Sequence, residues 1–177
     1  MDKNTIHANR REDWETPPSI IGPLKSYYRF TVDLAASRQN KIADNYFGPD
    51  HDVAWCRDFL LAEATWLAGR TCWINPPYGH YLLKFTIKIR QLAQAGISIV
   101  ALLPANIETR WFWENIHDHA DLICGRKGRI QFLLNGQRAM RIDKKTGKLV
   151  PNSNPTASIL ATFNLPHLGV PPGWIAL

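Results

Sequence analysis

Cysteine is scarce in this chain, and the three thiols present form no recognisable pattern. Cys56, Cys72 and Cys124 are odd in number and far apart in sequence, and no CxxC pair occurs among the 177 residues. The sequence therefore predicts neither a disulfide framework nor a zinc site, and no metal ligands are assigned. We expect buried free thiols in a reducing compartment.

Long apolar runs and targeting signals are missing as well. The N-terminal stretch MDKNTIHANRRED is polar, unlike a secretory signal peptide. No apolar run reaches the ~18 residues expected of a membrane span. We expect a soluble, cytoplasmic protein with no membrane partner. Its length predicts a single domain over residues 1–177, with a flexible arm at 1–13 and a Pro-rich tail at 164–177.

The net positive charge of the chain comes entirely from one segment, residues 126–148. This segment has one acid, Asp143, so it carries a net charge of +7, while the whole chain carries +6 and the remainder therefore −1. Such an excess favours a polyanionic partner, although a merely solvated hairpin would show the same composition. Its basic residues are Arg126, Lys127, Arg129, Arg138, Arg141, Lys144, Lys145 and Lys148.

The segment Asn75-Pro76-Pro77-Tyr78 is the most informative motif. It follows a short apolar run at 71–74 that is typical of a buried strand. Two prolines end that strand, because they lack a backbone N–H and fix φ. The Asn75 carboxamide and the Pro76 carbonyl can together accept two hydrogen bonds from one planar –NH2 group, beside the ring of Tyr78. The motif thus indicates a site for an exocyclic amine, unless it is only a strand that ends in a Pro-Pro loop.

A second group of residues follows the first predicted strand, at 29–33. Asp33 stands at its tip and is followed by Ala35 and Ala36, with no GxG motif. Small residues let a ligand approach the backbone, and an acid there can hold an ammonium group or a ribose hydroxyl; an ordinary strand-to-helix turn is the alternative. Asp50 or Asp52 lies where a second strand would offer an acid to a ribose, although loop solvation or helix capping would also explain them.

Helical and strand patterns alternate along the chain, which predicts an α/β fold. Residues 71–104 read as strand, helix and strand, with a right-handed crossover expected. Asn135-Gly136 predicts a type I′ turn between strands at 129–134 and 138–142. The helix of the βαβ unit at 71–104 is predicted at 81–95 and its second strand at 97–104. Further helices are predicted at 19–28 and 109–119, and further strands at 121–125 and 157–163.

Taken in order, several motifs resemble the phage-type DNA N6-adenine methyltransferases, a Dam-like family found in phages and prophages. The resemblance covers roughly residues 13–163. It rests on Trp14-Glu15-Thr16-Pro17, Asp33-Leu34-Ala35-Ala36, Asp58-Phe59, Asn75-Pro76-Pro77-Tyr78, the apolar strand ending at Pro104, Arg129-Ile130-Gln131-Phe132 and Pro155-Thr156-Ala157-Ser158.

The resemblance implies a class I, Rossmann-like methyltransferase fold, with a mostly parallel sheet, helices on both faces and a basic β-hairpin near the C-terminal end. It implies S-adenosylmethionine (SAM) as methyl donor, DNA as partner and the bacterial host cytoplasm as location. The cofactor would contact Trp14, Thr16, Pro17, Asp33, Ala35, Ala36 and Asp58, and the catalytic residues would be Asn75, Pro76, Pro77 and Tyr78.

The expected reaction is methylation of adenine N6 in DNA, with the target base flipped out of the duplex. The basic segment would grip phosphates and read a short or loose recognition sequence. The choice of adenine over cytosine rests on the resemblance, since both amines would satisfy Asn75 and Pro76. Two alternatives stay open: methylation of RNA guanine N2 or protein glutamine, and a catalytically inactive DNA-binding relative.

Overall fold

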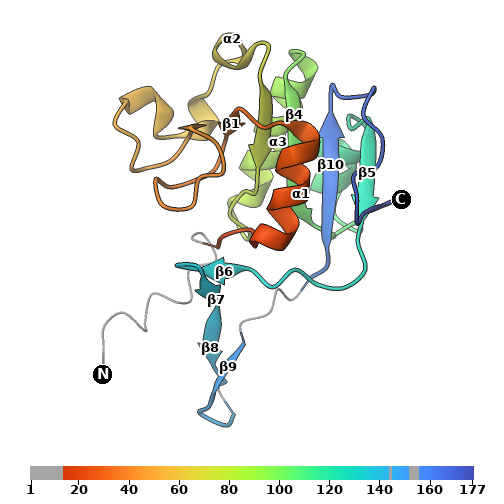
Figure 1. The fold of residues 1–177 in the computed structure, drawn as a ribbon. Helices are drawn as coiled ribbons and strands as arrows, with labels where there is room; N and C mark the ends of the chain where they lie inside the picture. The colour runs from red at the N-terminus through yellow and green to blue at the C-terminus, as the bar shows by residue number, and fades with distance from the viewer. Residues whose placement is uncertain (1–13, 144, 152–155) are drawn as a thin grey trace.

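The computed structural model describes residues 14–143, 145–151 and 156–177. Its centre is a seven-stranded sheet in the order β11-β5-β10-β4-β3-β1-β2 (Figure 1). β2, β1, β3 and β4 pair in parallel, whereas β10 runs antiparallel between β4 and β5. The predicted α/β architecture is confirmed, but the sheet is mixed rather than mostly parallel, because β11 also pairs antiparallel with β5 and three of its six pairings are antiparallel. The strands are β1 (Val32–Asp33), β2 (Asn45–Tyr46), β3 (Thr71–Ile74), β4 (Ser98–Pro104), β5 (Leu122–Gly125), β10 (Ser158–Phe163) and β11 (Ile175–Ala176).

Helices cover both faces of the sheet, and the side chains of β4 alternate between them. The odd-numbered side chains of residues 99–103 pack into one apolar core with α3 (Leu82–Gln94). The even-numbered ones pack into a second core with α1 (Pro18–Tyr28). A parallel strand buried on both faces needs a continuous apolar run, which explains the composition of this segment.

The ends of the two long helices follow from local backbone chemistry. α1 begins at Pro18, whose fixed φ suits the first helical position. It ends at Arg29, which has a φ of 56° and donates its N–H to the Lys25 carbonyl. Because Arg29 is left-handed, the strand predicted at 29–33 is confirmed only for β1. α3 is followed by Gly96 with a φ of 83°, the helix-ending glycine expected from the sequence.

Several short elements were not predicted, because they are too brief to show periodicity. They are β2, β11, the 3₁₀ helices η4 (Ala54–Cys56) and η5 (Phe59–Leu61), and α2 (Ala64–Leu67). The helix predicted at 109–119 is α4 (Arg110–Phe112) continued by a π-helical turn, η6 (Trp113–His117). Among the described residues no helix is long and apolar enough to cross a membrane. The Pro-rich segment packs on the sheet through β11 and the buried Trp174.

Two small hairpins extend from the body (Figure 1). β6 (Leu133–Leu134) pairs with β7 (Gln137–Arg138), and β8 (Met140–Ile142) pairs with β9 (Leu149–Pro151). The turn between β6 and β7 has positive φ at both central residues, 51° at Asn135 and 72° at Gly136. This is the predicted type I′ turn.

Candidate active site

The end of β3 presents a half-satisfied amide. Asn75 donates its side-chain Nδ2 to Thr16 Oγ1 at 3.3 Å. Its Oδ1 is buried, and within the described residues no group donates a hydrogen bond to it. A buried acceptor without a donor costs about 1–3 kcal/mol. The site would therefore be stabilised by a ligand that brings an N–H to this oxygen.

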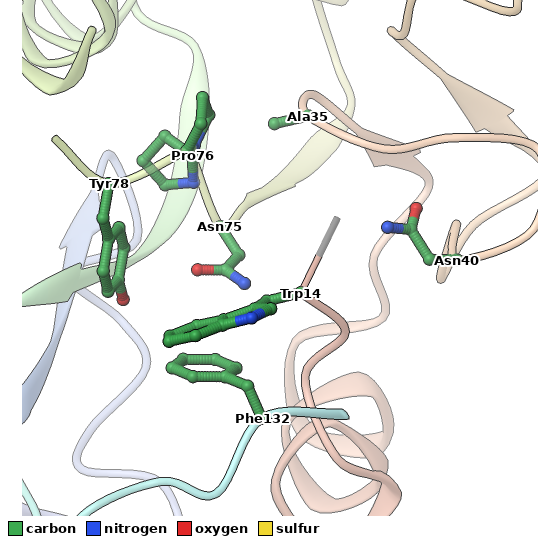
Figure 2. A pocket seen from close by; sticks show the side chains of 8 residues that line it. Trp14, Ala35, Asn40, Asn75, Pro76, Tyr78 and Phe132 are labelled. Atoms are coloured by element: carbon green, nitrogen blue, oxygen red, sulfur yellow. The ribbon is translucent and has the colours of Figure 1, made fainter. Parts of the chain in front are cut away.

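Aromatic rings surround this amide (Figure 2). Trp14 and Phe132 are stacked, with ring centroids 5.4 Å apart and an interplanar angle of 22°. Tyr78 meets Phe132 edge-on, at 6.1 Å and 89°. Burial raises the pKa of the Tyr78 phenol, so this ring stays neutral over the whole physiological range. The walls of the site are thus flat, uncharged and suited to a planar ligand.

The cavity beside Asn75 is small in this conformation. Its volume is about 20 Å³, room for about one water molecule. A nucleobase does not fit unless at least one aromatic ring moves. The lining residues are Trp14, Ala35, Asn40, Asn75, Pro76, Pro77, Tyr78 and Phe132.

A larger cleft of about 530 Å³ adjoins this cavity. It lies where β1 and β3 end and α3 begins, and its size is in the usual range for small-molecule sites. Ala35, Asn40, Asn75 and Pro77 line both spaces. Asn75 therefore stands at the junction of a site for a small molecule and a site for a flat amine.

Close backbone contact shapes one wall of the cleft. Ala36 donates its N–H to the Phe47 carbonyl at 2.9 Å, and both residues line the cleft. A Cβ placed on the next residue, Gly48, would lie 1.7 Å from the Ala36 carbonyl oxygen. Gly48 is thus required for the approach of the two loops, a role that its sequence context as a simple turn did not indicate.

Asp33 is buried and lines neither of the two spaces. Its Oδ1 accepts from the Ala35 N–H at 3.2 Å and its Oδ2 from the Ile42 N–H at 3.1 Å. Burial raises its pKa from 3.8 to about 6, while these two hydrogen bonds act in the opposite direction. In this structure Asp33 shapes the loop that carries Ala35 and Ala36, which both line the cleft. A contact between Asp33 and a cofactor stays a prediction.

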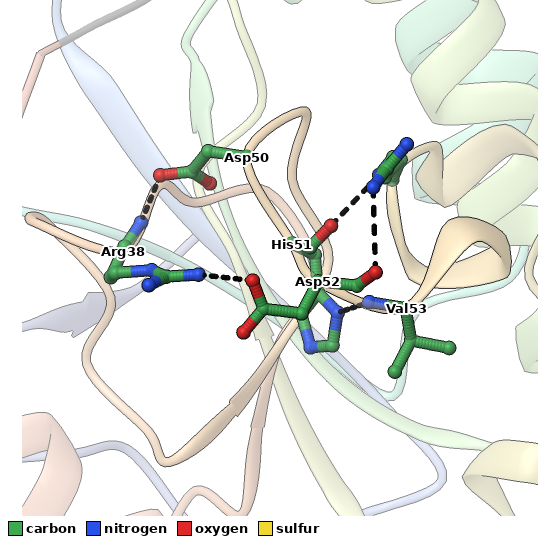
Figure 3. Close-up of polar contacts among 6 residues, drawn as sticks. Arg38, Asp50, His51, Asp52 and Val53 are labelled. Carbon is green, nitrogen blue, oxygen red and sulfur yellow. Dashed lines mark hydrogen bonds and ion pairs between the residues drawn. The ribbon is translucent and has the colours of Figure 1, made fainter.

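The other candidate acids differ in whether they line the large cleft. Asp58 lines the large cleft and accepts from the Leu60 N–H at 2.9 Å, which caps η5. Asp50 and Asp52 instead bind Arg38 (Figure 3). Asp50 accepts from the Arg38 backbone N–H at 2.8 Å, and Asp52 accepts from Arg38 Nη2 at 2.6 Å. Of the three acids, Asp58 is therefore the one placed to meet a ligand in the cleft.

The predicted cofactor residues before α1 lie on the side of the smaller cavity. Trp14 lines that cavity, and Thr16 contacts Asn75. Pro17 is the N-cap of α1, and its carbonyl accepts from the N–H groups of Ile20 and Ile21. Among the described residues, none of the three lines the large cleft, so their contact with a cofactor stays a prediction.

The sequence assigned no role to Phe132 or Asn40, which line the small cavity. Phe132 was visible only as part of a family motif, and its stacking on Trp14 joins residues 118 positions apart. No local pattern reveals such a contact. The same applies to Asn40, which follows no regular element.

The basic segment is largely available to solvent. Arg138 donates to Gln131 Oε1 at 2.9 Å, and the Arg126 guanidinium lies 6.0 Å from the centroid of Trp174. Arg141 belongs to β8, and Lys144 lies outside the described residues. Within the described ranges no ion pair joins the exposed cations to a carboxylate. These exposed cations are Lys127, Arg129, Arg138, Lys145 and Lys148.

Comparison with known proteins gives a consistent result. The family model described as DNA N-6-adenine-methyltransferase (Dam) matches residues 3–166. A DNA N-6-adenine-methyltransferase of Escherichia phage T1 is 26% identical over 159 residues, 81% of this chain and 59% of the phage protein. One of Haemophilus phage HP1 is 26% identical over 137 residues, 76% and 74% of the two chains. The chain thus spans less than two thirds of the T1 protein.

Proposed function

The chain belongs to the DNA N-6-adenine-methyltransferase (Dam) family, and from that premise we propose that it transfers a methyl group from SAM to N6 of adenine in DNA. The observation that carries the proposal is the buried Oδ1 of Asn75. It accepts no hydrogen bond from the described residues, and Asn75 lines both cavities.

We place SAM in the large cleft, and the fold supports this. β2 lies on one side of β1 and β3 on the other, so the strand order reverses there. Open parallel sheets bind ligands at such a switch point, beyond the carboxyl ends of the strands. The same arrangement supports a class I, Rossmann-like methyltransferase fold. Ala35 and Ala36 leave room for close approach, and Asp58 offers a carboxylate to polar groups of the cofactor.

SAM supplies an electrophilic methyl group, and the chain's own residues prepare the acceptor. Asn75 Oδ1 and the Pro76 carbonyl would accept the two N–H groups of the adenine amine. As the nitrogen becomes tetrahedral and positive, both hydrogen bonds strengthen, so they stabilise the transition state more than the ground state. Holding the amine in one fixed orientation by these two acceptors would supply a further part of the rate.

The aromatic walls would receive the base. An adenine inside a duplex cannot reach a site enclosed in this way, so it must be flipped out. Tyr78 would stack on it, next to the Trp14–Phe132 pair that Tyr78 meets edge-on. The cavity must enlarge from about 20 Å³ to accept a base, which requires these rings to move.

The exposed cations of the basic segment would bind DNA phosphates. Such contacts give sequence-independent affinity that falls steeply with salt. We propose that this segment, which includes most of the two short hairpins, contacts the DNA backbone and reads a short recognition sequence.

The test is methyl transfer from labelled SAM to unmethylated DNA, to RNA and to bulk protein, followed by analysis of the modified residue. The proposal predicts N6-methyladenine in DNA and no label in the other two substrates. Label in RNA guanine, in protein glutamine or in DNA cytosine would contradict it. A protein that binds SAM and DNA but transfers no methyl group would be an inactive relative.

A further inference from the structure

The three residues Trp14–Thr16 join the β6–β7 hairpin, called the hairpin below, to Asn75 at the end of β3. The backbone of Glu15 pairs with Leu133 in both directions, at 2.9 Å from Glu15 N–H to Leu133 carbonyl and 3.0 Å in reverse. This antiparallel bridge adds the segment to the edge of β6. The hairpin is therefore attached to the body by residues that precede α1.

The side chain of Glu15 holds the tip of the same hairpin. Its Oε2 accepts from the Gly136 N–H at 3.0 Å. Gly136 is the second central residue of the type I′ turn, with a φ of 72°. A hydrogen bond to a carboxylate is stronger than a neutral one. Backbone and side chain of one residue thus fix both a strand and the turn of the hairpin.

The two neighbours of Glu15 lie at the small cavity, where Thr16 bonds Asn75 and Trp14 forms part of the wall. Thr16 Oγ1 accepts from Asn75 Nδ2 at 3.3 Å. Trp14 stacks on Phe132, which directly precedes β6. Consecutive residues of an extended segment are only about 3.3 Å apart, so Trp14 and Thr16 lie directly beside the residue that holds the hairpin.

We propose that Glu15 is a positioning residue that couples the grip of the hairpin on DNA to the placement of Asn75 and opening of the cavity beside it. This inference rests on the proposed function. When the hairpin binds the DNA backbone, the bond from Glu15 to Gly136 carries its movement to the Trp14–Phe132 stack. The rings that close the cavity and the hydroxyl that orients the amide then move as one unit.

The coupling predicts a split between DNA affinity and turnover. Glu15→Ala removes the bond to Gly136 but leaves every basic side chain, so DNA affinity should stay within about twofold. The kcat at saturating DNA should fall at least about tenfold, because small misplacements of reacting groups are costly. Glu15→Gln retains an acceptor oxygen and should restore most of the kcat. Glu63→Ala, an exposed acid before α2, is the matched control.

Thr16→Val provides a second variant, in case Glu15→Ala does not fold. It keeps the shape of the side chain but removes the oxygen that accepts from Asn75, so kcat should fall with DNA affinity unchanged. Combined with Glu15→Ala, the two losses should be less than multiplicative, because both act through one path.

The outcomes separate the two proposals. If the wild-type protein methylates DNA and Glu15→Ala keeps its kcat, or loses DNA affinity alone, the coupling is refuted while the proposed function stands. Multiplicative losses in the double variant would also refute the coupling. If the wild-type protein transfers no methyl group to DNA, the proposed function fails, and this inference fails with it.

Discussion

Replacing Asp33 with asparagine should remove a pH-dependent part of the protein's stability. The Asp33 side chain is 3% exposed, and burial raises its pKa from 3.8 to about 6. A carboxyl group whose pKa is higher in the folded state favours folding when it is protonated. Its contribution is therefore complete below pH 3.8 and is lost as the pH rises through about 6. When the pH falls from 7 to 5, the unfolding free energy should therefore rise by about 1 kcal/mol.

Urea denaturation at pH 5 and pH 7 tests this for the wild-type protein and for Asp33→Asn. The variant should lack this gain of about 1 kcal/mol, whatever its absolute stability at either pH. Asp50→Asn is the matched control, because Asp50 is an exposed carboxylate that also accepts a backbone hydrogen bond. An identical pH dependence of wild-type protein and Asp33→Asn would refute the assignment of a raised pKa to Asp33.

Two further predictions concern the cleft and the basic segment. Gly48→Ala places a methyl group against the Ala36 carbonyl, so it should lower the unfolding free energy by about 1–3 kcal/mol and weaken SAM binding measured by calorimetry. Gly22→Ala, which has open space around it, should have neither effect. Equal effects of the two substitutions would contradict the steric argument. Replacing both Arg129 and Arg138 with alanine should reduce the slope of log DNA affinity against log salt by roughly 2 while SAM binding is unchanged; an unaltered slope would remove these residues from the DNA interface.

The central elements of the fold could be predicted because their patterns are local. The apolar run at 97–104 indicated a strand buried on both faces, and β4 confirms it. The helical spacing at 81–95 predicted α3, and Asn135-Gly136 predicted the type I′ turn. Strand β2 has two residues and takes its place from pairing with β1, so no periodic pattern announces it.

The site was predicted less completely, because its geometry depends on contacts between distant segments. The sequence predicted Asp33 as a cofactor contact at a strand tip, but it could not show that the carboxylate accepts two backbone N–H groups of its own loop. The sequence could not show that Trp14 stacks on Phe132 beside Asn75. The close approach of Gly48 to Ala36 is likewise a property of the folded chain alone.

The most direct test of the account is single-turnover methyl transfer by Asn75→Ala, with SAM binding measured on the same protein. The account predicts that formation of N6-methyladenine falls at least about 100-fold while SAM still binds, because the substitution removes the oxygen that accepts a hydrogen bond from the target amine. Transfer at the wild-type rate would contradict the role of Asn75 Oδ1. Loss of SAM binding that accounts for the whole defect would place the residue in the cofactor site instead.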